Sequence, residues 1–178
     1  MNAKEIHSFE PMKSIANTWL IFAAIAILAG CIRQETFPPE PVIRFKSIRT
    51  TPDSAVITMT FTDGDGDFGL RQSDTTGIFA DCLRRYNLYF EYYELQNGEW
   101  VHFPIDPCAD PNAVPFYYRV PWAEPSGQIK SQDGEITIVM TPFYFLPGPF
   151  DTCRFEIRAI DRSQKLSNVI RTSAFTKP

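Results

Sequence analysis

The chain has 178 residues, with 17 Lys and Arg against 21 Asp and Glu and a net charge of −4 at pH 7. This balance, without a basic stripe, argues against a nucleic-acid partner, since phosphate contacts need clustered Lys and Arg. Aromatic residues make up 14% of the chain and supply bulky apolar groups for a single core of ordinary size.

The first expected element is a signal peptide. Residues 19–31 form an uncharged apolar run that is shorter than the ~20 apolar residues a membrane-spanning helix needs. The run ends in Leu28-Ala29-Gly30-Cys31, which resembles the lipobox of bacterial lipoproteins. The resemblance implies cleavage after residue 30, a diacylglyceryl thioether on Cys31 and attachment of the chain to a membrane. The expected leader spans residues 1–30 of the sequence. Because Met12 begins a signal peptide of normal length, we expect translation to start at Met12.

Residues 31–41 are expected to form a linker. Pro38, Pro39 and Pro41 oppose helix and favour an extended, semi-rigid spacer. Such a spacer reaches about 30 Å, from ~3.1 Å per residue over roughly ten residues. The folded domain, expected at 42–178, should therefore lie close to the membrane.

The rest of the chain is predicted to be all-β. Apolar and polar residues alternate with period two in short runs between turn residues, and no segment shows a long helical stripe. In the clearest run, Ala55, Ile57, Met59 and Phe61 share one face. Seven to eight such strands predict an immunoglobulin-like or fibronectin type III-like β-sandwich, with a small barrel as the alternative. The strands are expected near 42–49, 55–62, 84–95, 99–103, 116–120, 135–141, 153–159 and 167–175, with a hairpin turn at 96–98.

One motif carries distinct chemistry, the run Asp63-Gly64-Asp65-Gly66-Asp67-Phe68-Gly69. Carboxylates a few Å apart repel each other by something like 1 kcal/mol per pair near a surface. Calcium removes this repulsion because it takes six to eight oxygen ligands, and glycine lets the chain curl so that alternate side chains converge. We therefore expect a Ca²⁺ site at Asp63, Asp65 and Asp67. The alternative is a solvated Asp-Gly turn without an ion.

Two residues are candidates for the fourth ligand of this site. Asp74 is at position 12 counted from Asp63, the position of the closing carboxylate in an EF-hand loop. The match is incomplete, since Phe68 stands where an EF-hand loop has glycine. Asp161 follows the strand at 153–159, and an immunoglobulin-like sandwich places that connection at the same end as the acidic loop. Asp161 or Asp74 is thus expected to complete the site, at the end of the domain that faces the linker.

Besides Cys31, three cysteines remain in an expected oxidising compartment, where disulfides form. Because three is an odd number, they cannot all pair with one another. Cys82 and Cys108 flank the predicted hairpin, where they form either a disulfide or two free thiols. Cys153 shares the apolar face of its strand, which predicts a buried free thiol. His102 is predicted to be an exposed strand residue. Since no catalytic or nucleotide-binding motif is present, the sequence predicts a protein that is not an enzyme.

Aromatic residues cluster at 86–93, 116–122 and 143–145. Consecutive aromatic residues on a strand point to opposite faces, so some rings should lie outside the core. Tyr118 and Trp122 are the candidate ligand platform, on which sugar rings would stack. The alternative is that these rings pack under loops or pair across strands.

The segments 61–70, 115–121 and 149–152 resemble a group of uncharacterised Bacteroidota lipoproteins, and 155–168 resembles the last two strands of fibronectin type III domains. These resemblances imply an envelope location and an immunoglobulin-like fold, with no established activity. Surface lipoproteins of that phylum tend to have an acidic cluster after the lipidated cysteine. Here Glu35 stands beside Arg33, which favours the periplasmic face of the outer membrane over the cell surface.

The leading expectation is a membrane-anchored, non-enzymatic binding or assembly module of the cell envelope. Its partners are expected to be the membrane, through the lipid anchor, and a second envelope protein or a glycan. One alternative is a glycan-binding surface lipoprotein that uses its exposed aromatic rings. The other is a carboxylate-dependent hydrolase, because any two acidic side chains can meet in space.

Overall fold

The computed structural model describes residues 37–177 apart from 111, 113, 126–129 and 142–147. The chain divides after residue 35, and every described residue lies in the second part, 36–178. The leader at 1–30, the start at Met12 and the lipidated Cys31 lie outside the described residues and stay predictions. Within the described part, no helix is long and apolar enough to cross a membrane.

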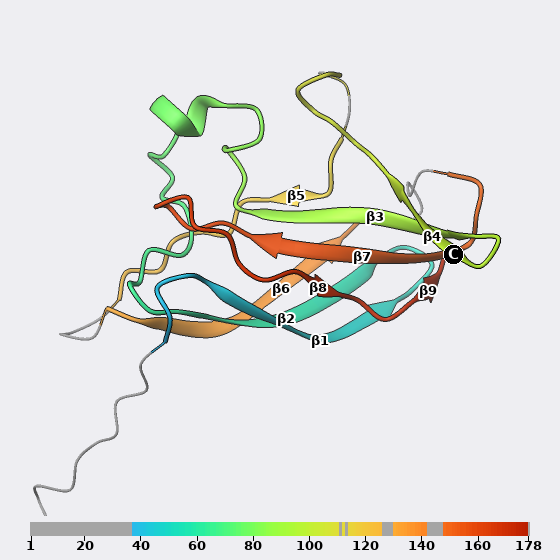
Figure 1. Ribbon diagram of the computed structural model, residues 1–178, viewed down its shortest axis with the longest axis horizontal. Helices are drawn as coiled ribbons and strands as arrows, with labels where there is room; N and C mark the ends of the chain where they lie inside the picture. Colours follow the sequence, from blue (N-terminus) through green and yellow to red (C-terminus); the bar gives the residue numbers. More distant parts are fainter. Residues whose placement is uncertain (1–36, 111, 113, 126–129, 142–147, 178) are drawn as a thin grey trace, which may run out of the picture. The chain divides into compact units, whose positions relative to one another are not determined.

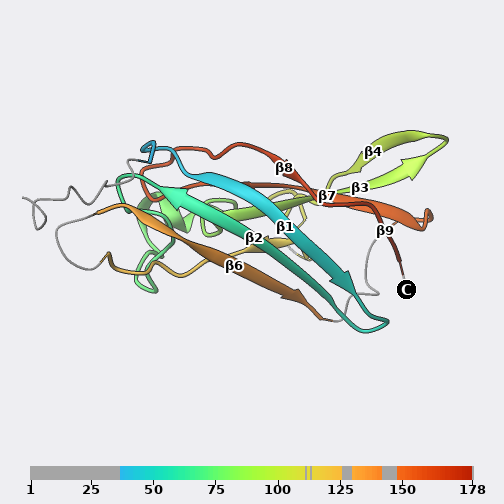
Figure 2. The same cartoon turned by 90° about the horizontal axis from the view of Figure 1, so that it is seen from below.

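The described residues form nine strands and one short 3₁₀ helix, η1, arranged as two antiparallel sheets (Figure 1, Figure 2). One sheet has the order β1-β2-β6. The other has the order β4-β3-β7-β8, with β5 added to β3 and β9 added to β7. This arrangement is the expected all-β sandwich of immunoglobulin-like type, with two separate sheets rather than one closed barrel. The elements are β1 (Val42–Thr50), β2 (Ala55–Asp63), η1 (Gly77–Ala80), β3 (Leu88–Gln96), β4 (Glu99–Phe103), β5 (Tyr117–Tyr118), β6 (Gln132–Met140), β7 (Thr152–Ala159), β8 (Ile170–Arg171) and β9 (Phe175–Thr176).

The core lies between the two sheets and follows the period-two pattern of the sequence. Ile57 and Met59 of β2 are fully buried, and so are Phe155 and Ile157 of β7. Each apolar side chain of this size stabilises the fold by about 1.5–3 kcal/mol when it leaves water. The register of β2 against β6 runs without a shift from Ala55 to Asp63, so the strand carries its last residue, an aspartate, to one end of the sandwich.

Strands β3 and β5 are shorter than the sequence predicted, because the side chain of Asn87 forms hydrogen bonds in place of a backbone partner. The Asn87 side chain accepts from the Val120 backbone N–H at 2.7 Å and donates to the Val120 carbonyl at 3.2 Å. Side-chain bonds therefore replace the backbone ladder beyond Tyr118, and β5 has two residues rather than five. On the other side of Asn87, the chain turns at Asp81, whose carboxylate accepts from two backbone N–H groups, and β3 begins at Leu88.

The last expected strand, 167–175, is divided into β8 and β9. Between them, the Thr172 hydroxyl accepts from the Phe155 backbone N–H at 3.0 Å. A side-chain oxygen thus replaces a backbone carbonyl in the ladder with β7 and interrupts it. The predicted hairpin turn between β3 and β4 is confirmed, since Asn97 and Gly98 have φ values of 52° and 89°, as a two-residue hairpin requires.

The described cysteines separate into one pair and one free thiol. Cys82 and Cys108 form a disulfide that ties the segment before β3 to the segment after β4. Cys153 is free and buried in the core, as its place on the apolar face of β7 predicted. Burial raises the pKa of the Cys153 thiol, so it stays protonated and unreactive at neutral pH.

Loss of the disulfide is expected to lower the free energy of unfolding by about 3 kcal/mol, because the bridge closes a loop across 26 residues in the unfolded chain. Urea denaturation of a Cys82→Ser, Cys108→Ser double variant measures this change. Adding reductant should lower the midpoint of the wild type and leave that of the double variant unchanged. An unchanged wild-type midpoint in reductant would show that the bridge contributes no stability.

Candidate metal centre

The acidic loop begins at the last residue of β2. Asp63 is fully buried, and its Oδ2 accepts from the backbone N–H groups of Asp67 at 2.8 Å and Phe68 at 3.1 Å. These bonds fold the chain back on itself over four residues. Gly66 makes the curl with a φ of 73°, and a Cβ at this position would lie 1.7 Å from the Lys130 carbonyl oxygen. The glycine is therefore required both for its conformation and for the space.

The turn after β7 brings a fourth carboxylate to the loop. Asp161 is fully buried, and its Oδ1 accepts from the Lys165 backbone N–H at 2.8 Å. This turn is bonded directly to the acidic loop: the Arg162 N–H donates to the Asp67 carbonyl at 3.2 Å and the Ser163 N–H donates to Asp67 Oδ2 at 3.0 Å. The fold thus brings together residues that are almost a hundred positions apart in sequence.

Four aspartates meet at this point and form what we call the aspartate cluster: Asp63, Asp65, Asp67 and Asp161. Each offers one carboxylate oxygen, and these four oxygens all lie within 4.8 Å of one another. One oxygen of each carboxylate is buried and has no hydrogen-bond partner, whereas the other is held by a bond from the chain. Leaving a charged acceptor buried and unpaired costs several kcal/mol, so the arrangement needs a cation or protons. The unpaired atoms are Asp63 Oδ1, Asp65 Oδ1, Asp67 Oδ1 and Asp161 Oδ2.

The electrostatics of the cluster show the same need. Burial, with repulsion from Asp65 and Asp67, raises the pKa of Asp63 from 3.8 to about 6, against the lowering effect of its backbone hydrogen bonds. Burial and repulsion from its neighbours likewise raise the pKa of Asp161 to about 6. A cation that neutralised the cluster would reverse these shifts.

One cation from the chain already touches the cluster at its rim. The Lys165 ammonium group is hydrogen-bonded to Asp65 Oδ2. Asp65 lies at the rim of the cluster, since 38% of its side chain is exposed. It does not reach the unpaired oxygens of Asp63 and Asp161. The cluster of four aspartates, of which Asp63 and Asp161 are buried, can therefore hold a metal ion, and its all-oxygen ligand set suits a hard cation.

The prediction for Asp74 needs a correction, because this residue is not part of the cluster. Its carboxylate accepts from the Arg162 guanidinium at 2.9 and 3.3 Å and from the Arg71 backbone N–H at 2.8 Å. Burial opposes ionisation, yet the bonds from Arg162 and Arg71 hold the pKa of Asp74 below its usual value. The EF-hand spacing was misleading because the Asp74 carboxylate is bonded to Arg162 and to the Arg71 backbone instead of joining the other carboxylates.

The loop is also bonded to the expected linker. The Gly64 N–H donates to the Pro38 carbonyl at 2.8 Å, and Lys165 donates to the Pro39 carbonyl at 3.3 Å. A Cβ on Gly64 would lie 2.2 Å from the Phe37 carbonyl oxygen, so the two segments pack directly against each other. The aspartate cluster therefore lies at the end of the domain where the linker enters.

Tyr118 and Trp122 do not form a shared exposed platform. Tyr118 packs against the core, with its ring edge-on to Phe90 at 5.2 Å. The Trp122 indole N–H donates to the Gly66 carbonyl at 3.1 Å, and the Arg71 guanidinium lies 4.2 Å from the centre of its ring. Trp122 is thus part of the wall around the acidic loop.

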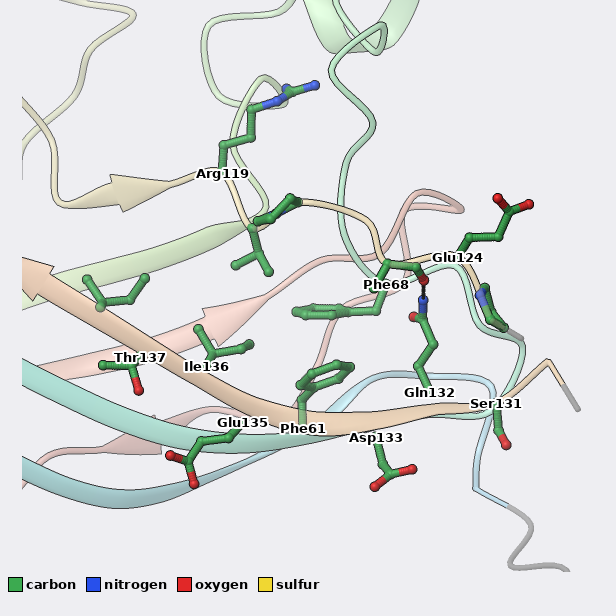
Figure 3. Close-up of a pocket in the computed structure, with 15 residues that line it drawn as sticks. Phe61, Phe68, Arg119, Glu124, Ser131, Gln132, Asp133, Glu135, Ile136 and Thr137 are labelled. Atoms are coloured by element: carbon green, nitrogen blue, oxygen red, sulfur yellow. Dashed lines mark hydrogen bonds between the residues drawn. The ribbon is translucent and has the colours of Figure 1, made fainter. Parts of the chain in front are cut away.

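A cavity of about 610 Å³ lies beside the cluster, between β6 and the segment 119–125. Figure 3 shows Phe61, Phe68 and Ile136 pointing into it and Asp133 and Glu135 pointing away. Phe68 links the cavity to the cluster, since its backbone N–H binds Asp63 while its ring packs 4.6 Å from that of Phe61.

The sequence did not indicate the roles of Ser163 and Lys165. Ser163 donates to Asp67 Oδ2 and Lys165 donates to Asp65 Oδ2, so the Oδ1 atom of each aspartate is left unpaired. Both residues lie in the segment 155–168, whose resemblance to fibronectin type III strands gives them no role in a metal site, and only the fold brings them to the acidic loop. Ser163 does follow Asp161 by two positions, so a search of the turn after β7 for hydrogen-bond donors would have found it.

No protein-family model matches the chain, and no curated protein matches it. Fold and site alone therefore define its class. The chain is an all-β sandwich of immunoglobulin-like type with a partly buried four-aspartate cluster that can hold a metal ion.

Proposed function

We propose that the chain is a non-enzymatic module of the cell envelope, anchored by a lipid on Cys31 and stabilised by one Ca²⁺ ion in the aspartate cluster. Two observations carry the calcium proposal: the four aspartates each offer a carboxylate oxygen within 4.8 Å of the others, and each has one buried oxygen without a hydrogen-bond partner. The lipobox-like tetrad carries the anchor.

Calcium fits the cluster better than other common cations. It accepts six to eight oxygens in flexible geometry, so water and backbone carbonyls can complete a set of four carboxylates. Magnesium demands near-ideal octahedral geometry and keeps much of its water, whereas structural zinc sites are built mainly from Cys and His. The cluster contains neither Cys nor His.

The ion would join the acidic loop to the turn after β7, and the acidic loop is in turn bonded to the linker through Gly64 and Pro38. Its role in this proposal is to fix the direction in which the linker leaves the domain. A module held close to a membrane needs a defined orientation to meet a second envelope protein. We place it at the periplasmic face of the outer membrane, since Arg33 and Glu35 do not make an acidic cluster after Cys31.

A carboxylate-dependent hydrolase is disfavoured by the burial of the acids. Asp63 and Asp161, whose pKa values are raised, are fully buried, and neither lines the neighbouring cavity. A substrate would have to displace the hydrogen bonds that hold both side chains.

Calcium is expected to change the fluorescence of Trp122, because the indole N–H is bonded to Gly66 inside the acidic loop. Titration of the purified chain with CaCl₂ measures the change. The change should persist in a Trp100→Phe variant, whose tryptophan lies on β4, and disappear in Trp122→Phe. A signal that survives in Trp122→Phe, or no signal below millimolar calcium, would contradict the proposed site.

The anchor makes a separate prediction. A Cys31→Ser variant is expected to move from the membrane to the soluble or precursor fraction, because the hydroxyl cannot form the thioether. Intact-mass measurement should show that the wild-type chain begins at Cys31 and carries lipid. Recovery of an unacylated wild-type chain would remove the proposed location and leave the calcium site untouched.

A further inference from the structure

A second concave site lies on the outer face of the larger sheet, away from the core. It has a volume of about 440 Å³, within the range of about 300–1,000 Å³ that is typical of small-molecule sites. Residues of β3, β5 and β7 form its floor, and the disulfide-linked segment and the turn after β7 form its walls. We call it the tyrosine–arginine cleft, and its main lining residues are Leu83, Arg84, Tyr89, Tyr117, Arg158 and Leu166.

The two tyrosines of the cleft are held in place by their own hydroxyl groups. The Tyr89 hydroxyl donates to the Tyr86 carbonyl at 2.8 Å, and the Tyr117 hydroxyl donates to Glu91 at 3.1 Å. The rings meet edge-on, with centres 5.1 Å apart and planes at 72°. A ligand therefore meets a preorganised pair of rings and loses little entropy in ordering them.

The charge that remains in the cleft is positive. Arg158 is exposed, and within the described residues it makes no hydrogen bond or ion pair that would neutralise it. The Arg84 guanidinium donates to the uncharged amide of Gln164. Glu91 is the acidic residue of the cleft, and it already accepts from Tyr117 and from His102 at 2.9 Å. Arg84 also lies near the Asp81 carboxylate, so the unused capacity of the site is the guanidinium group of Arg158.

We propose that the tyrosine–arginine cleft binds an acidic saccharide, with a uronic acid ring against the tyrosines and its carboxylate on Arg158. Arginine forms two parallel hydrogen bonds with a carboxylate, and the apolar C–H face of a sugar packs on aromatic rings. Leu83 and Leu166, which are 39% and 54% exposed, supply apolar surface at the rim of the cleft.

The strand arrangement disfavours an extended acidic peptide at this site. β3 lies between β7 on one side and β4 and β5 on the other, and the edge strand β5 has only two residues, which is too short for an extended peptide to pair along it. The proposal rests on none of the calcium ligands and is independent of the proposed function.

Calorimetric titration of the purified full chain in detergent tests this site, with trigalacturonate as the probe. We expect binding in the micromolar to millimolar range, and an Arg158→Gln variant should bind at least tenfold more weakly. Arg49→Gln removes an exposed arginine on β1 of the other sheet and should bind like the wild type. Tyr117→Phe, which keeps the ring but loses the hydroxyl bond to Glu91, should bind only slightly more weakly, whereas Tyr117→Leu should lose about tenfold.

Two further ligands separate the saccharide from other anions. Galactotriose, which lacks the carboxylates, and tetraglutamate, which lacks the sugar rings, should both bind at least tenfold more weakly than trigalacturonate. Absence of trigalacturonate binding, equal binding by Arg158→Gln, or equal binding of tetraglutamate would each overturn the proposal. Circular dichroism of every variant would show that a loss of binding is not a loss of fold.

Discussion

Replacing Asp161 by Asn is expected to raise the melting temperature of the chain without calcium and to lower it, relative to the wild type, with calcium. Without the ion, the variant removes one buried negative charge, and the new amide can donate to the unpaired oxygens of its neighbours. The gain should be about 1–3 kcal/mol at pH 7.5, or roughly 3 °C per kcal/mol. With calcium at a thousand times its dissociation constant, the wild type gains about 4.1 kcal/mol, which the variant loses and which exceeds the gain from the substitution.

The pH dependence of the metal-free protein has the same origin. The pKa values of Asp63 and Asp161 in the folded state are about 6, above the 3.8 of an unperturbed aspartate. The folded state therefore binds protons more tightly than the unfolded state between these values, and its stability falls as the pH rises from about 4 to about 6. Asp161→Asn should reduce this loss.

Differential scanning calorimetry in EDTA and in CaCl₂ measures both expected changes in the melting temperature, the rise without calcium and the fall with calcium. Asp53→Asn is a matched control, because Asp53 is exposed in the turn between β1 and β2, at the opposite end of β2 from the cluster. It should change the melting temperature little in either buffer. An Asp161→Asn variant that calcium stabilises as much as the wild type would show that Asp161 is not a ligand.

Replacing Lys177 by Met is expected to destabilise the chain by about 3–5 kcal/mol, because it leaves a buried carboxylate without its counter-charge. Glu94 is fully buried, and its Oε1 accepts from the Lys177 ammonium group at 2.8 Å and from the Tyr92 hydroxyl at 3.0 Å. The same ammonium group donates to the Gly148 carbonyl at 2.8 Å. The pair thereby holds the segment after β9 against β3.

A double variant, Glu94→Leu with Lys177→Met, should recover most of the lost stability, since removing both charges removes the unpaired one. Lys46→Met is the control, because Lys46 and Glu135 form an exposed ion pair that should contribute less than about 1 kcal/mol. Urea denaturation measures all three variants. A loss below 1 kcal/mol for Lys177→Met, or no recovery in the double variant, would contradict the account.

The sheets could be predicted from sequence where one face of a strand is buried. Ala55, Ile57 and Met59 alternate with polar residues, and β2 follows this pattern almost to the residue. The strand ends could not be predicted, because side chains such as those of Asn87 and Thr172 replace backbone partners across the sheet. Such bonds depend on the completed fold and leave no local pattern.

The candidate site was predictable to the extent that the fold was. Three of the clustered aspartates stand in one loop, and the strand order of an immunoglobulin-like sandwich indicated Asp161 as one of two candidates for the fourth, beside Asp74. The pairing of Glu94 with Lys177 was not predictable, since the two lie 83 residues apart and neither belongs to a motif. The tyrosine–arginine cleft was missed because its residues come from three strands and two loops.

Calorimetric titration of the purified chain with CaCl₂ tests the central claim most directly. The account predicts one ion per chain at pH 7.5 and much weaker binding at pH 5, where protons occupy Asp63 and Asp161 and must be released by the ion. An Asp63→Asn variant should show no binding under either condition. Absence of binding below millimolar calcium at pH 7.5, or unchanged binding by Asp63→Asn, would contradict it.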